Sequence, residues 1–213
     1  MYLINGILHT MVSDVICDGF VSFENGKITA VGRMDELRLP EGAEVLDVTG
    51  CHIYPGLVDA HSHLGMFGDS LGFESDDGNE ITDPVTPQLR AIDAINPFDR
   101  CFQEAREGGV TTVVTGPGSA NAIGGQMAAI KTVGRRVDDM ILRAPVAMKF
   151  ALGENPKSCY NDRHETPITR MATAALIREE LFKAREYLEK KERSAEDEDT
   201  DAPEFDLKME SLL

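Results

Sequence analysis

The sequence has few basic residues and no long apolar run, and each shortage excludes a class of protein. Its 213 residues contain 21 Lys and Arg against 37 Asp and Glu, which gives a formal net charge of −16. Nucleic acids and anionic membranes would repel such a chain, so neither is an expected partner. No stretch approaches 18 consecutive apolar residues, so no segment is expected to span a membrane.

Cysteine is also scarce. Cys17, Cys51, Cys101 and Cys159 are widely spaced and include no Cys-x-x-Cys pair. This spacing argues against a zinc ribbon and favours reduced thiols over a disulfide framework. The N-terminal segment lacks the basic region and the long apolar region of a signal peptide. We therefore expect a cytoplasmic protein.

Residues 1–54 have the pattern of a small all-β domain. Asn25-Gly26 separates the apolar runs 20–23 and 28–31, and Asn-Gly between apolar runs predicts a β-hairpin. Further strands are expected at residues 2–4, 45–48 and 52–54. A segment of this length would form only a marginal core by itself.

Residues 55–213 alternate expected strands with expected helices. Strands are predicted at 57–60, 110–115 and 145–150, and helices at 97–107, from 167 onward with Thr166 as the cap, and at 207–213. This alternation after a β segment predicts an α/β fold with a parallel (β/α)8 barrel of the TIM type. A complete barrel needs roughly 250 residues, whereas 158 follow Pro55. We therefore expect residues 55–213 to form only the first half of a barrel.

Two polar segments interrupt this alternation. The long insertion of residues 65–96 is expected to shape a pocket, because loops of this length in compact domains are usually functional or disordered. The acidic run of residues 195–206 contains no Lys or Arg, which predicts a solvated or mobile loop. Between them, the helix from residue 167 has a predicted apolar face formed by Ile177, Leu181, Ala184 and Leu188.

The main candidate for chemistry is His61-Ser62-His63, which ends the first expected strand after Pro55. Residues i and i+2 of an extended chain point to the same side, so both imidazoles could aim at one point. Imidazole is a common ligand of zinc and related divalent ions. A His-x-His taken without its context is more often a pair of surface histidines, so the neighbouring residues carry the argument.

The segment Pro55-Gly56-Leu57-Val58-Asp59-Ala60-His61-Ser62-His63 resembles the first-strand signature of the metal-dependent amidohydrolase superfamily. The 54 residues before it resemble the N-terminal segment of that family, and the whole chain is most similar to the N-terminal half of imidazolonepropionase-like and related members. The resemblance implies a composite β-sandwich over residues 1–54, completed by distant C-terminal strands. It further implies hydrolysis of C–N bonds, in amides, cyclic amides or amidine-like groups of a small molecule, by a metal-activated water. The implied metal is zinc, with iron or manganese as alternatives.

The resemblance implies two further metal ligands. Lys149 ends an apolar strand, where an amine is costly to bury, and some members carry a carboxylated lysine there that bridges two metals. The alternative for Lys149 is a side chain that reaches the surface. Glu154, in an expected loop at 153–157, matches a glutamate ligand of other branches, and an ion pair with Lys157 is its alternative. Asp59 could orient a ligand or only support the strand.

The turn Gly116–Asn121 follows an expected strand and could present backbone amides to a substrate carbonyl or carboxylate. Gly118, Ser119 and Asn121 are the substrate-binding candidates in this turn. The alternative is a turn that is rich in glycine only because its backbone needs positive φ angles.

The later histidines and the catalytic aspartate that the resemblance implies have no counterpart after Lys157. The general-base aspartate is therefore expected beyond Leu213, in a missing C-terminal half or in a complementary chain, and this chain alone is expected to be inactive. Two alternatives remain open, a non-catalytic half-barrel that associates with a complementary chain and a metal-free pseudoenzyme. Homo-oligomerisation is also expected.

Overall fold

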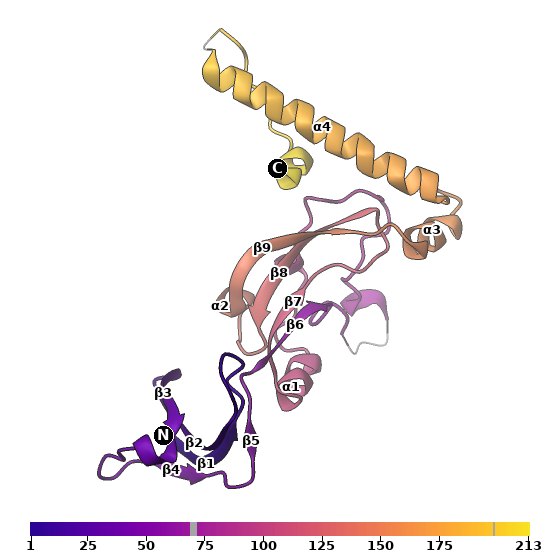
Figure 1. Ribbon diagram of the computed structural model, residues 1–213. Helices are drawn as coiled ribbons and strands as arrows, with labels where there is room; N and C mark the ends of the chain where they lie inside the picture. Colours follow the sequence, from indigo (N-terminus) through magenta and orange to yellow (C-terminus); the bar gives the residue numbers. More distant parts are fainter. Residues whose placement is uncertain (69–71, 198) are drawn as a thin grey trace. The chain divides into compact units, whose positions relative to one another are not determined.

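The computed structural model describes residues 1–68, 72–197 and 199–213 and divides the chain into two compact units, Met1–Leu57 and Val58–Leu213. Each unit is described by itself (Figure 1). Residues 69–71 of the predicted insertion and Glu198 of the acidic run lie outside the described residues. No helix of the described part is long and apolar enough to cross a membrane.

The first unit is a five-stranded sheet with β1 at its centre. Its strands are β1 (Tyr2–Leu8), β2 (Ile16–Glu24), β3 (Lys27–Arg33), β4 (Val45–Asp47) and β5 (His52–Ile53). β1, β2 and β3 pair antiparallel in sequence order, whereas β4 and β5 both run parallel to β1. Asn25 and Gly26 have φ angles of 52° and 74°, so the predicted Asn-Gly hairpin between β2 and β3 is confirmed. The composite β-sandwich stays a prediction, because a sandwich consists of two packed sheets and the first unit forms this one.

The second unit is built on a four-stranded sheet of order β6-β7-β8-β9. Its strands are β6 (Leu57–Ser62), β7 (Val110–Thr115), β8 (Ile123–Lys131) and β9 (Ile141–Phe150), with helix α1 (Arg100–Glu107) before β7 and the short helix α2 (Val137–Met140) before β9. The amide of Gly116 donates to the carbonyl of Ser62 at 3.3 Å. The carboxyl ends of β6 and β7 therefore lie together, as the predicted strand–helix–strand order requires.

The prediction of parallel strands is wrong beyond β7. β8 pairs antiparallel with β7, and β9 pairs antiparallel with β8. Parallel neighbours need a crossover of a dozen or more residues, and only the turn 116–122 separates β7 from β8. The apolar stretch around Ala129 and Ile130 is therefore a hairpin strand, which the sequence analysis did not assign.

The core of this sheet lies between β7, β8 and α1. Phe102 of α1 is 2% exposed, and Val113 of β7 and Ile130 of β8 are both fully buried in the same cluster. α1 begins at Arg100, three residues later than predicted from Pro97, because the side chain of Asp99 caps it by accepting from the amide of Cys101.

Three helices follow the sheet: α3 (Glu154–Asn161), α4 (Arg170–Glu196) and α5 (Leu207–Leu212). The predicted helix at 207–213 is thus confirmed, but the predicted cap of α4 is wrong. The residue before a proline is kept out of the helical region, so Thr166 precedes the helix, and the hydroxyl of Thr169 accepts from the amide of Ala172 instead.

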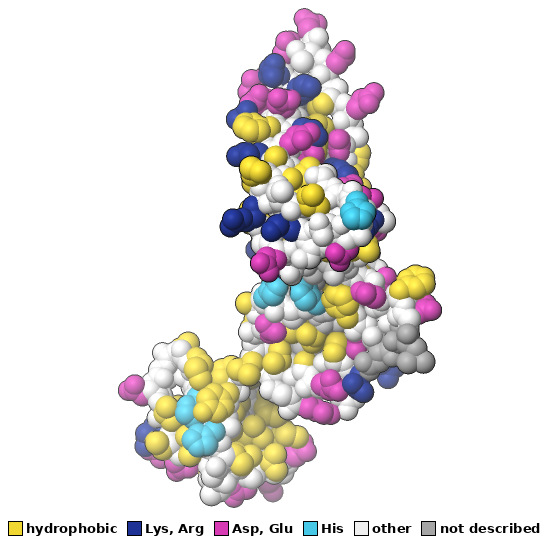
Figure 2. Space-filling model, turned by 90° about the vertical axis from the view of Figure 1, so that its right-hand side faces the viewer, with side chains coloured by type: hydrophobic (Ala, Val, Ile, Leu, Met, Phe, Trp, Pro, Cys, Tyr) yellow, Lys and Arg dark blue, Asp and Glu magenta, His cyan; other side chains and the backbone are white. Residues whose placement is uncertain are grey.

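The predicted apolar face of α4 is only half correct. Ile177 and Ala184 are buried as expected, but Leu181 and Leu188 are 46% and 37% exposed. Tyr187 is buried instead, against Met209 of α5. The contact with α5 moves the buried stripe around the helix. Elsewhere on α4 charges of both signs alternate, as Figure 2 shows in its upper part.

A buried polar chain ties the Gly116–Asn121 turn to α3. The hydroxyl of Tyr160, whose side chain is fully buried, donates to Asn121 Oδ1 at 2.7 Å, and Asn121 Nδ2 donates to the hydroxyl of Thr86 at 2.9 Å. The Thr86 hydroxyl in turn donates to the carbonyl of Ile123 at 3.2 Å. Each buried polar atom in this series of hydrogen bonds thus has a partner. Such partners are needed because a buried polar atom without one destabilises the folded state.

Replacing Tyr160 by Phe should therefore destabilise the second unit. The change keeps the ring but leaves the buried Asn121 Oδ1 without its donor, which costs about 1–3 kcal/mol of unfolding free energy. Urea denaturation measures the loss. Tyr54→Phe is the control, because Tyr54 is 53% exposed; equal effects of the two substitutions would contradict the structural role of Tyr160.

Candidate metal centre

His61 and His63 lie at the carboxyl end of β6 and share one side of the chain. Their ring centroids are 5.3 Å apart with an interplanar angle of 78°. Lys149, near the end of β9, brings its Nζ to 3.4 Å from Nε2 of His61. The structure therefore gathers three nitrogen-bearing side chains that the sequence analysis had named as ligand candidates.

The orientation of His63 is set by β7. Its Nδ1 lies 2.7 Å from the carbonyl oxygen of Gly116, the residue that directly follows the strand. A carbonyl can only accept a hydrogen bond, so Nδ1 carries the proton and Nε2 keeps a free lone pair. An imidazole held in this way is the usual form of a metal-binding histidine.

The surroundings of His61 and Lys149 lower the pKa of both groups. The ammonium of Lys149 lowers the pKa of His61 most, partial burial and His63 lower it further, and only Asp59 opposes them. Desolvation lowers the pKa of Lys149. Metal ions bind nitrogen donors in their deprotonated form, so both shifts go in the direction that metal binding needs.

Asp59 contacts the backbone rather than a ring. Its carboxylate accepts from the amide of His61 at 3.1 Å. This bond fits the alternative in which Asp59 supports the strand, and its effect on the His61 imidazole is limited to the charge described above.

Glu154 does not lie in a loop, as the sequence analysis expected, because it is the first residue of α3. It is exposed, and it lines a cavity of about 280 Å³ together with Lys149 and Ser119. Within the part of the chain that the structure describes, no group of three or more His, Cys, Asp and Glu side chains is placed to hold a metal. His61, His63 and Lys149 therefore fit a zinc-class ion by donor type but supply only part of its coordination.

The candidate substrate-binding turn makes contacts within the protein. The amide of Gly118 donates to the carbonyl of Gly78 at 2.8 Å, and Asn121 belongs to the buried polar chain of Tyr160. Ser119 faces the same cavity as Lys149. Substrate binding by the turn stays a prediction.

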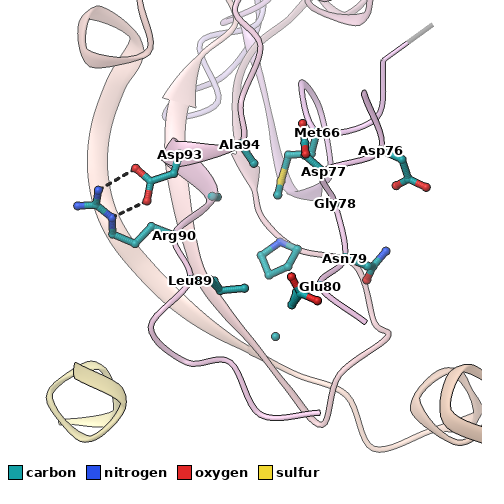
Figure 3. Close-up of a pocket in the computed structure, with 13 residues that line it drawn as sticks. Met66, Asp76, Asp77, Gly78, Asn79, Glu80, Leu89, Arg90, Asp93 and Ala94 are labelled. Atoms are coloured by element: carbon teal, nitrogen blue, oxygen red, sulfur yellow. Dashed lines mark hydrogen bonds and ion pairs between the residues drawn. The ribbon is translucent and has the colours of Figure 1, made fainter. Parts of the chain in front are cut away.

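A larger pocket of about 360 Å³ is formed mainly by the insertion. Figure 3 shows Met66, Asp77, Glu80 and Leu89 around it, with the ion pair of Arg90 and Asp93 at one side. It adjoins the candidate centre, because Pro117 also lines it and the amide of Met66 donates to the carbonyl of His63. The insertion thus lines a pocket, as predicted from its length, and the fold decides which of its residues face the cavity.

The remaining histidines belong to other segments of the chain. In the first unit, His9 Nε2 lies 2.8 Å from His52 Nδ1, and the ring of His9 stacks on Tyr54 at a centroid distance of 4.2 Å. His164 follows α3 and is exposed.

Comparisons with known proteins identify the family. An amidohydrolase named tasK from Hapsidospora irregularis is 36% identical over 186 residues, which is 82% of this chain and 19% of that protein. A D-hydantoinase from Geobacillus stearothermophilus is 41% identical over 69 residues, 32% of this chain and 13% of that protein. A crystal structure of an amidohydrolase from Thermotoga maritima matches with a TM-score of 0.89 and 42% identity, over 99% of this chain and 54% of that chain.

The chain belongs to the amidohydrolase superfamily. An imidazolonepropionase from Bacillus cereus is also 48% identical over 56 residues, 26% of this chain and 13% of that protein. No protein-family model matches the chain. The chain spans about half the length of the solved amidohydrolase and less than a fifth of the curated relatives it matches. The predicted resemblance to the N-terminal region of this superfamily is confirmed.

Replacing Lys149 by Met should raise the pKa of His61 toward its ordinary value, because the ammonium of Lys149 is the main cause of its depression. An NMR titration of the histidine ring protons in the metal-free chain measures the change. Arg143→Met, another cation of β9, serves as the control. A carboxylated Lys149 would carry a negative charge, so a downward movement of the His61 pKa in Lys149→Met would contradict a cationic Lys149.

Proposed function

We propose that this chain is part of a metal-dependent hydrolase of C–N bonds in amides, cyclic amides or amidine-like groups of a small molecule. The observation that carries the proposal is the convergence of His61, His63 and Lys149, with Nδ1 of His63 already held by Gly116. The amidohydrolase and D-hydantoinase relatives support the same class of reaction.

In this proposal His61 and His63 hold a divalent ion, zinc or else iron or manganese, through their ring nitrogens. Such an ion polarises a carbonyl and lowers the pKa of a bound water to about 7. Gly116 keeps His63 in the tautomer that leaves Nε2 free. Lys149 acts as a neutral amine or, when carboxylated, as a carboxylate-like ligand, and Glu154 is the competing ligand. The general-base aspartate and the remaining ligands come from residues beyond Leu213 or from a complementary chain, so this chain alone is inactive.

The contact between Lys149 and His61 joins the two edges of the sheet. β6 and β9 are at opposite edges of the sheet, which would separate them by about 14 Å in a flat sheet with strand spacings of 4.7–4.9 Å. Lys149 nevertheless reaches His61.

Elemental analysis of the purified chain tests the metal. We expect stoichiometric zinc, iron or manganese, and loss of this metal in the double variant His61→Ala/His63→Ala. His9→Ala/His52→Ala is a matched control, because it also removes two neighbouring imidazoles, in the other unit. Absence of metal from the unaltered chain, or equal loss in both variants, would overturn the proposed centre and favour the metal-free pseudoenzyme.

A second candidate function is a half-barrel that associates with a complementary chain or with a copy of itself. It is favoured by β6, which is the edge strand of its sheet and leaves Leu57 and Val58 exposed to 55% and 66%. An exposed apolar edge strand offers unpaired backbone groups to another chain.

Light scattering over a range of concentrations tests this association. We expect the chain to form oligomers, and Val58→Lys to shift it toward the monomer, because a charge on an edge strand opposes pairing. Phe98→Lys is the control, since Phe98 is 75% exposed and precedes α1. A monomer at all concentrations would rule out association with a copy of itself.

A further inference from the structure

Two buried hydroxyl groups lie on either side of His63, and the proposed chemistry makes no use of them. Ser62 is 8% exposed and Thr115 is fully buried. The Ser62 hydroxyl donates to the carbonyl of Val114 at 3.2 Å, and the Thr115 hydroxyl donates to the carbonyl of Leu64 at 2.9 Å. Both bonds therefore join the histidine-bearing segment to β7.

The Thr115 hydroxyl makes its hydrogen bond just beyond the end of β6. β6 ends at Ser62, and the chain turns away at Gly65, which has a φ of 82°. At this turn the Thr115 side chain supplies the donor for the carbonyl of Leu64. The backbone of Thr115 pairs with Ala128 of β8 on the other side. Thr115 thus connects the turn to the centre of the sheet.

The two hydroxyl bonds enclose the bond that orients His63. His63 directly follows Ser62, and Gly116 directly follows Thr115. Gly116 donates through its amide to the carbonyl of Ser62 and accepts through its carbonyl from His63 Nδ1 at 2.7 Å. A shift of the turn relative to β7 would lengthen this last bond. Because side chains alternate along a strand, the Ser62 hydroxyl points away from both imidazoles and does not compete for their nitrogens.

We propose that Ser62 and Thr115 form a hydroxyl clamp that positions His63 and holds its Nδ1–H tautomer. They are positioning residues, because they contact the backbone around His63 and not a substrate or an ion. The link from the clamp to metal affinity rests on the proposed function, whereas the link to the tautomer of His63 does not.

The test uses one substitution that removes the hydroxyl and one that restores it. Thr115→Val keeps the shape of the side chain, and Thr115→Ser returns the donor. Thr132→Val is the matched control, since Thr132 is 1% exposed and its hydroxyl donates to the carbonyl of Val110, at the opposite end of β7. Nitrogen-15 NMR of the imidazoles reports the tautomer of His63 in the metal-free chain, and titration with zinc reports affinity.

We expect Thr115→Val to lower the fraction of His63 in the Nδ1–H form and to weaken zinc binding about tenfold, as is typical for loss of a group that orients a metal ligand. Thr115→Ser should restore both, and Thr132→Val should change neither, although both valine variants lower thermal stability. If Thr115→Val does not fold, Ser62→Ala tests the other arm of the clamp.

An unchanged His63 tautomer in Thr115→Val, or the same change in Thr132→Val, would overturn the clamp. The two proposals fail separately. Absence of zinc binding in the unaltered chain contradicts the metal centre, while the imidazole spectrum of the same sample still decides whether the clamp exists.

Discussion

The hydrogen bond between His63 Nδ1 and the carbonyl of Gly116 joins the candidate centre to the rest of the second unit. β6 is an edge strand with exposed side chains, and β7 is its neighbour in the sheet. β7 itself is central, and its Val113 packs in the core with Phe102 of α1. The position of the histidines therefore depends on a buried strand to which they do not belong. The packing of β7 in the core therefore helps to fix the position of the histidines, because the carboxyl ends of β6 and β7 are neighbours.

The candidate centre is formed by residues on or next to β6 and β9, two strands at opposite edges of the sheet. His61 and Lys149 are 88 residues apart in the sequence, and their proximity lowers the pKa of His61 because the lysine ammonium opposes a second positive charge. Partial burial lowers the pKa of Lys149 as well. Both shifts ease the loss of a proton, which nitrogen donors must lose before they bind a metal ion. The chain spans about half of the solved amidohydrolase.

Local patterns in the sequence predicted the elements whose causes are local. The Asn25-Gly26 hairpin follows from backbone conformations that Asn and Gly adopt readily, and the bounds of β7 follow from its β-branched residues. The errors have tertiary causes. The sequence shows β8 only as an apolar stretch, and the short turn before it makes it the second strand of an antiparallel hairpin. The buried stripe of α4 depends on where α5 packs against it. The cap predicted at Thr166, directly before Pro167, is wrong because a second threonine, Thr169, stands three residues later at the start of the helix.

The local sequence was enough to predict that two imidazoles lie on one side of a strand, because the alternation of side chains is a property of any extended chain. The residues around those histidines were also enough to predict the superfamily. The further groups that join them follow from the three-dimensional fold. Lys149 reaches His61 from the opposite edge of the sheet, the end of β7 supplies the carbonyl that orients His63, and the buried partners of Asn121 keep its side chain within the protein. These contacts link residues far apart in the chain, so they arise from packing and pairing that no short pattern encodes.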